Sequence, residues 1–373
     1  MKIIKILFFT ILFTLFAKEI SIFIFQSKVE SRVYNTGFFY LSQNPLSSLH
    51  NFDSLFSPYH IYLLNFKPSP IELVRYFENI CYLSYAIIFF SFSLSYGLLV
   101  SFILSSIVVI SPLTLIQRTW ISFPDTFTFL FSLIFVIQKL YSSKDLMTES
   151  TIVSESNKNF INTIFLLKQE FKKKLPSYFF FIIIISFGLF NHFYQFFIIS
   201  LEIISISFFF LKNKYRFILD LIFLILVAFF IRCLTQYLFL INNIDIVDYR
   251  LNFVKSLSYS ELIKINFTNL FTAIYGFLFG LWIIFLYDVV FKRNYTHIFI
   301  FFNSFCITCF TIDTTRVFTL LFFVPFLYSL ILNLNNYTNR EKKILSYLVV
   351  LSSLIFSFQP LYYKWGEKII YLK

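Results

Sequence analysis

The chain has 373 residues, of which 58% are hydrophobic and only 13% are charged, and its mean hydropathy is +0.77. A soluble domain carries about a quarter of charged residues, so this composition excludes a soluble fold. The formal charge of +12 comes from Lys and Arg residues in short segments between apolar runs. Such charges indicate membrane orientation rather than binding to nucleic acid. We predict an all-α, polytopic transmembrane helical bundle with the lipid bilayer as its partner and no nucleic-acid partner.

The chain starts with a short basic segment and an apolar run that reaches Ala17. This pattern is also typical of a cleaved signal peptide. Apolar residues resume after Lys18-Glu19 and continue to Phe25, which favours an uncleaved first membrane helix. Residues 26–78 follow as a long polar loop that contains several prolines and aromatic residues, and we expect this loop to be folded or to lie on the membrane.

Two later apolar runs, 79–111 and 178–211, are too long for single helices, because about 20 residues span the hydrocarbon. We predict that each forms two helices, with breaks near Gly97 and at the polar stretch from Asn191 to Gln195. Residues 111–125 are predicted to form a loop or a re-entrant piece. The whole chain, 1–373, is then a single integral membrane domain with about eleven spans, the others being the first helix, 126 to about 140, 215–240, 268–290, 296–311, 316–333 and 344–361.

Basic residues alternate along the loops between these spans. They gather in the predicted inner loops, which include the basic loop 141–176 and the segments 139–140, 212–216, 291–295 and 334–343. By the positive-inside rule the N-terminus is cytoplasmic. The loops 26–78 and 241–267 are then the first and second outer loops.

This topology brings polar groups from five places to the outer side. The places are the first outer loop, Pro124-Asp125, Asn191 to Gln195, the 241–267 loop and Asp313 to Arg316. An acid and a base at a membrane boundary are costly to keep, which favours a functional site. An Asp313–Arg316 pair that only fixes a helix end is the alternative.

This layout of a first helix, a long outer loop with acids and aromatic residues, and short outer loops resembles the GT-C class of membrane glycosyltransferases. The resemblance implies a polyprenyl-phosphate-linked sugar as donor, used at the extracytoplasmic face of a bacterial inner (plasma) membrane. In that class a carboxylate early in the first outer loop acts as the base or binds a metal, often as a pair of adjacent acids. The first outer loop has no adjacent acids here, which departs from the pattern.

The residues can be matched to the chemistry that such a transfer needs. A carboxylate must accept the acceptor proton, and Asp53, between His50 and His60, is our candidate base. Cations must hold the leaving phosphate, and Arg316 and Arg118 are the candidates because guanidinium binds phosphate bidentately. We expect Asp313 to orient Arg316, and Asp125 to orient Arg118.

The predicted break after Asn191 supplies two further candidates. His192 is a candidate acid or base, with a satisfied interface histidine as the alternative, and Gln195 is a candidate ligand for a sugar hydroxyl. The histidines and acids of the first outer loop have no spacing typical of metal ligands. We therefore expect no cofactor, and nothing in the sequence supports a divalent metal.

Three other functions fit a chain of this kind. A polysaccharide polymerase or ligase also acts on lipid-linked glycans with outer arginines. A membrane transporter would use acids at helix depth, such as Glu202, with Arg232 as a partner, although no inverted repeat is found. A non-catalytic membrane subunit is the last alternative.

Overall fold

The computed structural model describes most of the predicted helical segments. The described residues are 2–25, 36–46, 55–65, 67–119, 124–147, 175–211, 214–244, 260, 261, 264, 276, 278–309, 314–358, 361–363 and 369–371. The fold is all-α, apart from one short antiparallel hairpin of β1 (Leu361–Tyr363) and β2 (Ile369–Tyr371). The sequence did not predict this hairpin near the C-terminus.

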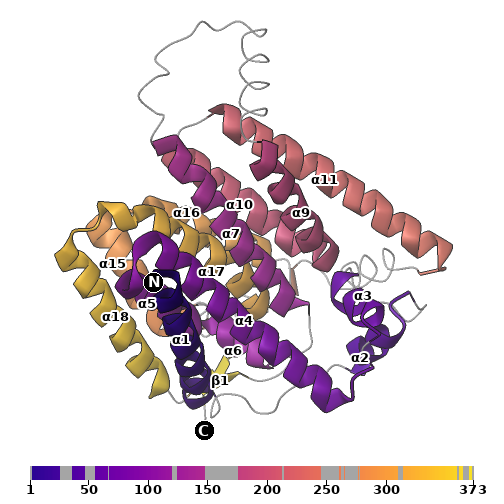
Figure 1. Ribbon diagram of the computed structural model, residues 1–373, viewed down its shortest axis with the longest axis horizontal. Helices are drawn as coiled ribbons and strands as arrows, with labels where there is room; N and C mark the ends of the chain where they lie inside the picture. Colours follow the sequence, from indigo (N-terminus) through magenta and orange to yellow (C-terminus); the bar gives the residue numbers. More distant parts are fainter. Residues whose placement is uncertain are drawn as a thin grey trace, which may run out of the picture.

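The α-helices of the described residues are arranged as a bundle (Figure 1). They are α1 (Lys2–Phe25), α2 (Thr36–Gln43), α3 (Phe56–Leu63), α4 (Pro70–Tyr96), α5 (Leu98–Val109), α6 (Pro112–Thr119), α7 (Asp125–Met147), α9 (Leu175–Asn191), α10 (Phe193–Leu211), α11 (Lys214–Ile241), α15 (Trp282–Lys292), α16 (Tyr295–Thr308), α17 (Thr314–Asn333) and α18 (Asn339–Ser357).

Both predicted breaks in the long apolar runs are confirmed. Gly97 separates α4 from α5 with a φ of +83°, a left-handed conformation that glycine adopts without steric cost. His192 separates α9 from α10. The segment 111–125 contains α6, which is bent by 54° from α5. Pro112 at the start of α6 lacks a backbone N–H, which suits the first turn of a helix.

The first outer loop is shorter than predicted, because α4 begins at Pro70 rather than Asn79. Ser69 and Glu72 form a capping box, in which each side chain bonds the backbone N–H of the other residue. This cap starts the helix among polar residues, where hydropathy alone gives no signal. The same loop contains α2 and α3, which pack on one another.

Five of the described helices are long and apolar enough to cross a membrane, namely α1, α4, α10, α11 and α17. The number is six if the bent pair of α5 and α6 forms one span. Helices α9 and α16 are apolar but shorter. These lengths are those of an integral membrane protein with several spans.

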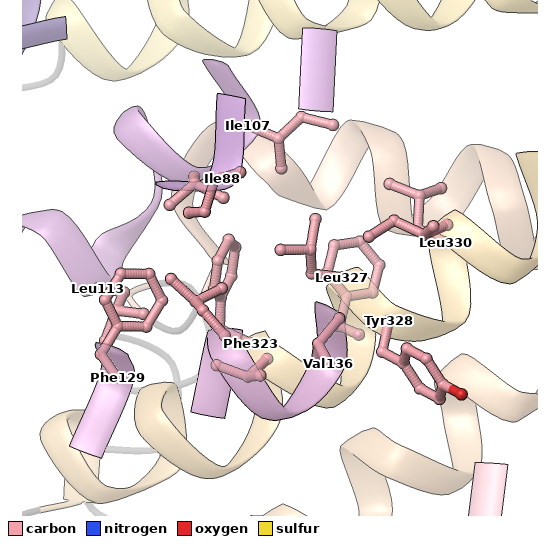
Figure 2. Close-up of a cluster of buried hydrophobic side chains, with 14 of the residues drawn as sticks. Ile88, Ile107, Leu113, Phe129, Val136, Phe323, Leu327, Tyr328 and Leu330 are labelled. Atoms are coloured by element: carbon pink, nitrogen blue, oxygen red, sulfur yellow. The ribbon is translucent and has the colours of Figure 1, made fainter. Parts of the chain in front are cut away.

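Helix α17 forms the centre of the bundle, and every residue from Phe318 to Leu332 is buried. It packs against α6, α7, α10 and α16. Figure 2 shows Phe323 and Leu327 of α17 among side chains of α4 to α7, including Ile88 and Val136. A helix that is apolar on all sides belongs in such a core. By contrast, α11 exposes large side chains along its length, such as Phe229 and Leu240, as expected of a helix that faces lipid.

Candidate functional site

Asn191 joins three helices at one end of the bundle. It is the last residue of α9, and its side chain is completely buried. Its Nδ2 donates to the carbonyl of Pro124 (2.8 Å) and to the hydroxyl of Thr128 (2.9 Å), at the start of α7. Its Oδ1 accepts a hydrogen bond from Ser57 of α3. A buried amide with both ends bonded fixes the positions of these helices.

Asp125 and Arg316 form an ion pair beside this junction. Arg316 Nη1, in the first turn of α17, lies 3.4 Å from Asp125 Oδ2. The carboxylate is the first residue of α7, where the helix dipole favours a negative charge. Its side chain is 2% exposed, whereas that of Arg316 is 18% exposed. Arg316 is therefore held by a buried acid while its side chain stays partly exposed.

Arg118 lies in α6 and contacts other helices. Its Nη1 donates to the hydroxyl of Ser21 in α1 (3.1 Å), and it lies beside Tyr82 of α4. The expected orientation of Arg118 by Asp125 stays a prediction, whereas the ion pair described for Asp125 is with Arg316. The Asp125–Arg316 pair could not be predicted from sequence distance, because the two residues are far apart in the chain.

His192 and Gln195 lie at the break between α9 and α10. His192 is half-buried, and Gln195 is buried. At the break, the His192 N–H bonds the carbonyl of Gly188, and the Phe196 N–H bonds the carbonyl of His192. A Cβ on Gly188 would lie 2.3 Å from the ring of Phe196, so glycine is required for this close packing. The structure places Gln195 inside the bundle, one turn beyond Asn191.

Four of the five predicted polar places thus meet at one end of the bundle. Ser57, from the first outer loop, contacts Asn191. Asn191 in turn contacts Pro124, which precedes Asp125 of the ion pair with Arg316. The candidates Asp53 and Asp313 lie outside the described residues, as does most of the 241–267 loop. Ser57 and Thr128 were not predicted, because single hydroxyl residues have no distinctive spacing.

An apolar pocket of about 290 Å³ adjoins the Asn191 junction, between α3, α9 and α11. Leu55 and Phe190 line it, and their backbones are linked by a hydrogen bond of 2.9 Å. The full lining is Leu46, Leu55, Phe56, Tyr59, His60, Leu63, Phe187, Phe190 and Leu238. In Figure 1, α3 lies beside the ends of α9 and α11. The pocket can hold an apolar chain, with the polar junction on one side.

His60 is the histidine among the residues that line this pocket. Its Nδ1 lies 3.0 Å from the carbonyl of Phe56, and its Nε2 lies 3.0 Å from the hydroxyl of Tyr76. A carbonyl only accepts, so Nδ1 carries the proton and Nε2 of the neutral ring accepts from Tyr76. Burial lowers the pKa of His60 below its ordinary value of 6.5.

This pKa predicts that acid weakens the docking of α3. The unfolded loop takes up a proton near pH 6.5, whereas the folded loop takes it up only at lower pH. The stability from neutral His60 is therefore present above pH 6.5 and is lost as the pH falls through the folded pKa. We expect the thermal midpoint of wild type to fall between about pH 7 and about pH 5 by more than that of His60→Gln. Equal slopes for the two proteins would contradict this.

A buried ion cluster lies where α7 and α11 meet. Lys139 contacts Asp220, and Arg216 Nε lies 3.8 Å from the same carboxylate. Arg216 also donates to the carbonyl of Ser142 (2.6 Å) and to its hydroxyl. Lys139, Asp220 and Arg216 are at most 6% exposed. The charge pattern predicts cytoplasmic loops for Lys139 and Arg216, but both side chains lie inside the bundle.

Another buried polar group joins α15, α16 and α17. His297 Nδ1 lies 3.3 Å from Asp288 Oδ2, and Asn294 Nδ2 donates to Asp288 (3.1 Å). Both His297 and Asp288 are at most 1% exposed. No three His, Cys, Asp or Glu side chains within the described part of the chain form a group that could hold a metal ion.

No family model, curated protein or solved structure matches this chain. A function is therefore inferred from the residues of the chain itself. One end of the described bundle combines a partly exposed cation, a buried acid and an adjoining pocket, and it contains Arg316, Asp125 and Asn191.

Proposed function

We propose that this chain is a multi-pass membrane glycosyltransferase that uses a polyprenyl-phosphate-linked sugar. The proposal rests on the Asp125–Arg316 pair, which lies beside the Asn191 junction and its adjoining apolar pocket. A lipid-linked sugar has an anionic phosphate next to an apolar chain. The partly exposed arginine side chain suits the phosphate, and the pocket suits an apolar chain.

The proposed reaction is a displacement at the anomeric carbon. The acceptor oxygen forms a bond to that carbon, the bond to the phosphate oxygen breaks, and polyprenyl phosphate leaves. Arg316, and Arg118 nearby on α6, would stabilise the negative charge that grows on the leaving phosphate. Asp53 is the proposed base that takes the acceptor proton, and Gln195 and His192 are proposed to contact the sugar. No metal or other cofactor is part of the proposal.

The proposal is tested with the full chain in lipid vesicles. The probe is a polyprenyl-phosphate hexose with a mixture of short oligosaccharide acceptors, and the readout is acceptor-dependent release of polyprenyl phosphate. Release with transfer of a single sugar supports the proposal. A second assay uses a polyprenyl-phosphate-linked oligosaccharide as donor, and transfer of the whole oligosaccharide would instead favour a polysaccharide polymerase or ligase. Absence of any release in both assays, from vesicles that contain folded protein, would overturn the enzymatic function.

The proposed topology has about eleven spans, a cytoplasmic N-terminus and the site on the extracytoplasmic face of a bacterial inner (plasma) membrane. Five described helices are long and apolar enough to span, six with the bent pair of α5 and α6, and shorter or less apolar helices lie at or within the other predicted spans. We expect a compartment-sensitive reporter to read outside after Ser48 and Asn243. The same reporter should read inside after Ser150, Asn213, Asn294 and Asn335. Opposite readings for Ser48 and Asn243 would exclude one shared outer site.

A further inference from the structure

Glu202 lies in the interior of α10, two helical turns beyond Gln195, and is 3% exposed. Asn303 Nδ2 and the Ser304 hydroxyl of α16 both donate to Glu202 Oε1, the latter at 3.5 Å. Among the described residues Oε2 has no hydrogen-bond partner, although it is buried. The described hydrogen-bond donors therefore bond Oε1 of the carboxyl group and not Oε2.

No cation lies within ion-pair distance of Glu202 in the described part of the bundle. The helices that pack against α10 are α7, α9, α11 and α17, and α16 contacts Glu202 directly. Their charged and titratable side chains near the bundle interior have other contacts. These are Asp125 with Arg316, Lys139 and Arg216 with Asp220, Arg232 over the rings of Phe193 and Tyr194, Tyr328 with Ser207, and His297 with Asp288.

An unpaired carboxylate at this position would be very unfavourable. Burying an ionised group without a counter-charge costs several kcal/mol or more, and acids within membrane helices are a default indication of a functional site. Asn303 and Ser304 supply hydrogen bonds but no positive charge. The remaining oxygen, Oε2, is free to carry a proton.

We propose that Glu202, with Asn303 and Ser304, is a proton-binding site inside the membrane bundle. Binding places the proton on Oε2 while Oε1 keeps its two donors, and release leaves a carboxylate that the site cannot neutralise. The α10–α16 contact is then expected to loosen when the proton leaves. This function goes beyond the proposed sugar transfer, because Glu202 contacts neither Arg316 nor Asp125.

A hydrophobic carbodiimide tests the site, because it adds to protonated carboxyls in apolar surroundings. We expect labelling of Glu202 in the full chain in lipid vesicles, located by peptide mass. Labelling should fall about tenfold per pH unit above its midpoint, and Glu202→Gln should remove it. Glu261, exposed in the second outer loop, is the matched internal control and should stay unlabelled over the same range. Labelling of Glu202 that is absent at every pH, or does not change with pH, would overturn the proposal.

Thermal stability gives an independent test that needs no reagent access. Gln has the shape and the neutral charge of protonated Glu, so Glu202→Gln should keep the thermal midpoint within about 2 °C at neutral pH. At alkaline pH wild type should lose stability relative to Glu202→Gln, because only wild type must ionise a buried group. Stabilisation of wild type by sodium, but not of Glu202→Gln, would show a metal-cation site and overturn the proton assignment.

Discussion

Replacing Asp220 with asparagine should destabilise the chain by about 3–5 kcal/mol, the usual cost of removing one partner from a buried ion pair. Asp220 is the shared acid of Lys139 and Arg216. Asparagine keeps the size of the side chain but removes its charge. Two cations would then face one another inside the bundle without a counter-charge. We expect a large fall in the thermal midpoint of the purified protein in detergent.

A double variant of Lys139 and Asp220 is the control for Asp220→Asn. Lys139→Met combined with Asp220→Asn removes one buried cation with the anion, and Arg216 keeps its hydrogen bonds to Ser142. This double variant should recover much of the lost stability. Glu261→Gln, which makes the same charge change at an exposed position in the second outer loop, should have little effect. An Asp220→Asn protein as stable as wild type would contradict the interpretation of the cluster as an obligatory buried pair.

The sequence predicted the helices well because each carries its own local signal. Apolar runs, the lone Gly97 and the polar stretch after Asn191 locate the spans and the two breaks, and the structure has helices there. The start of α4 was missed, because its signal is the Ser69–Glu72 capping box rather than hydropathy. Hairpin β1–β2 was missed because its strands have three residues each.

The contacts between helices could not be predicted in the same way. Positive charges near loops were read as orientation signals, yet Lys139 and Arg216 are buried partners of Asp220. The sequence carries no mark that separates a basic residue in solvent from one that turns into the bundle. The convergence of Ser57, Pro124, Asn191 and Arg316 followed from topology alone, but the partner of Asp125 depended on how α7 packs against α17.

Replacing Arg316 with glutamine should lower acceptor-dependent release of polyprenyl phosphate by at least about a hundredfold, the usual effect of losing one donor to a developing negative charge. Arg316 is the partly exposed cation of the site, and glutamine keeps a hydrogen-bond donor but loses the charge and the bidentate geometry. Arg316→Lys keeps the positive charge but loses the bidentate geometry of the guanidinium, so it should retain part of the activity. The measurement is release by equal amounts of each protein in lipid vesicles.

Variants of Asp125 and of Arg293, an arginine outside the site, test whether the effect of Arg316→Gln is specific to Arg316. Asp125 contacts Arg316 from its buried side, so Asp125→Asn should reduce release by less than Arg316→Gln. The double variant should be no slower than Arg316→Gln, because the acid acts only through the arginine that it holds. Arg293, exposed after the end of α15, is the matched control, and Arg293→Gln should transfer at the wild-type rate. If Arg316→Gln is as active as wild type and equally abundant in the membrane, Arg316 does not bind the leaving phosphate, and Arg118 becomes the cation to test.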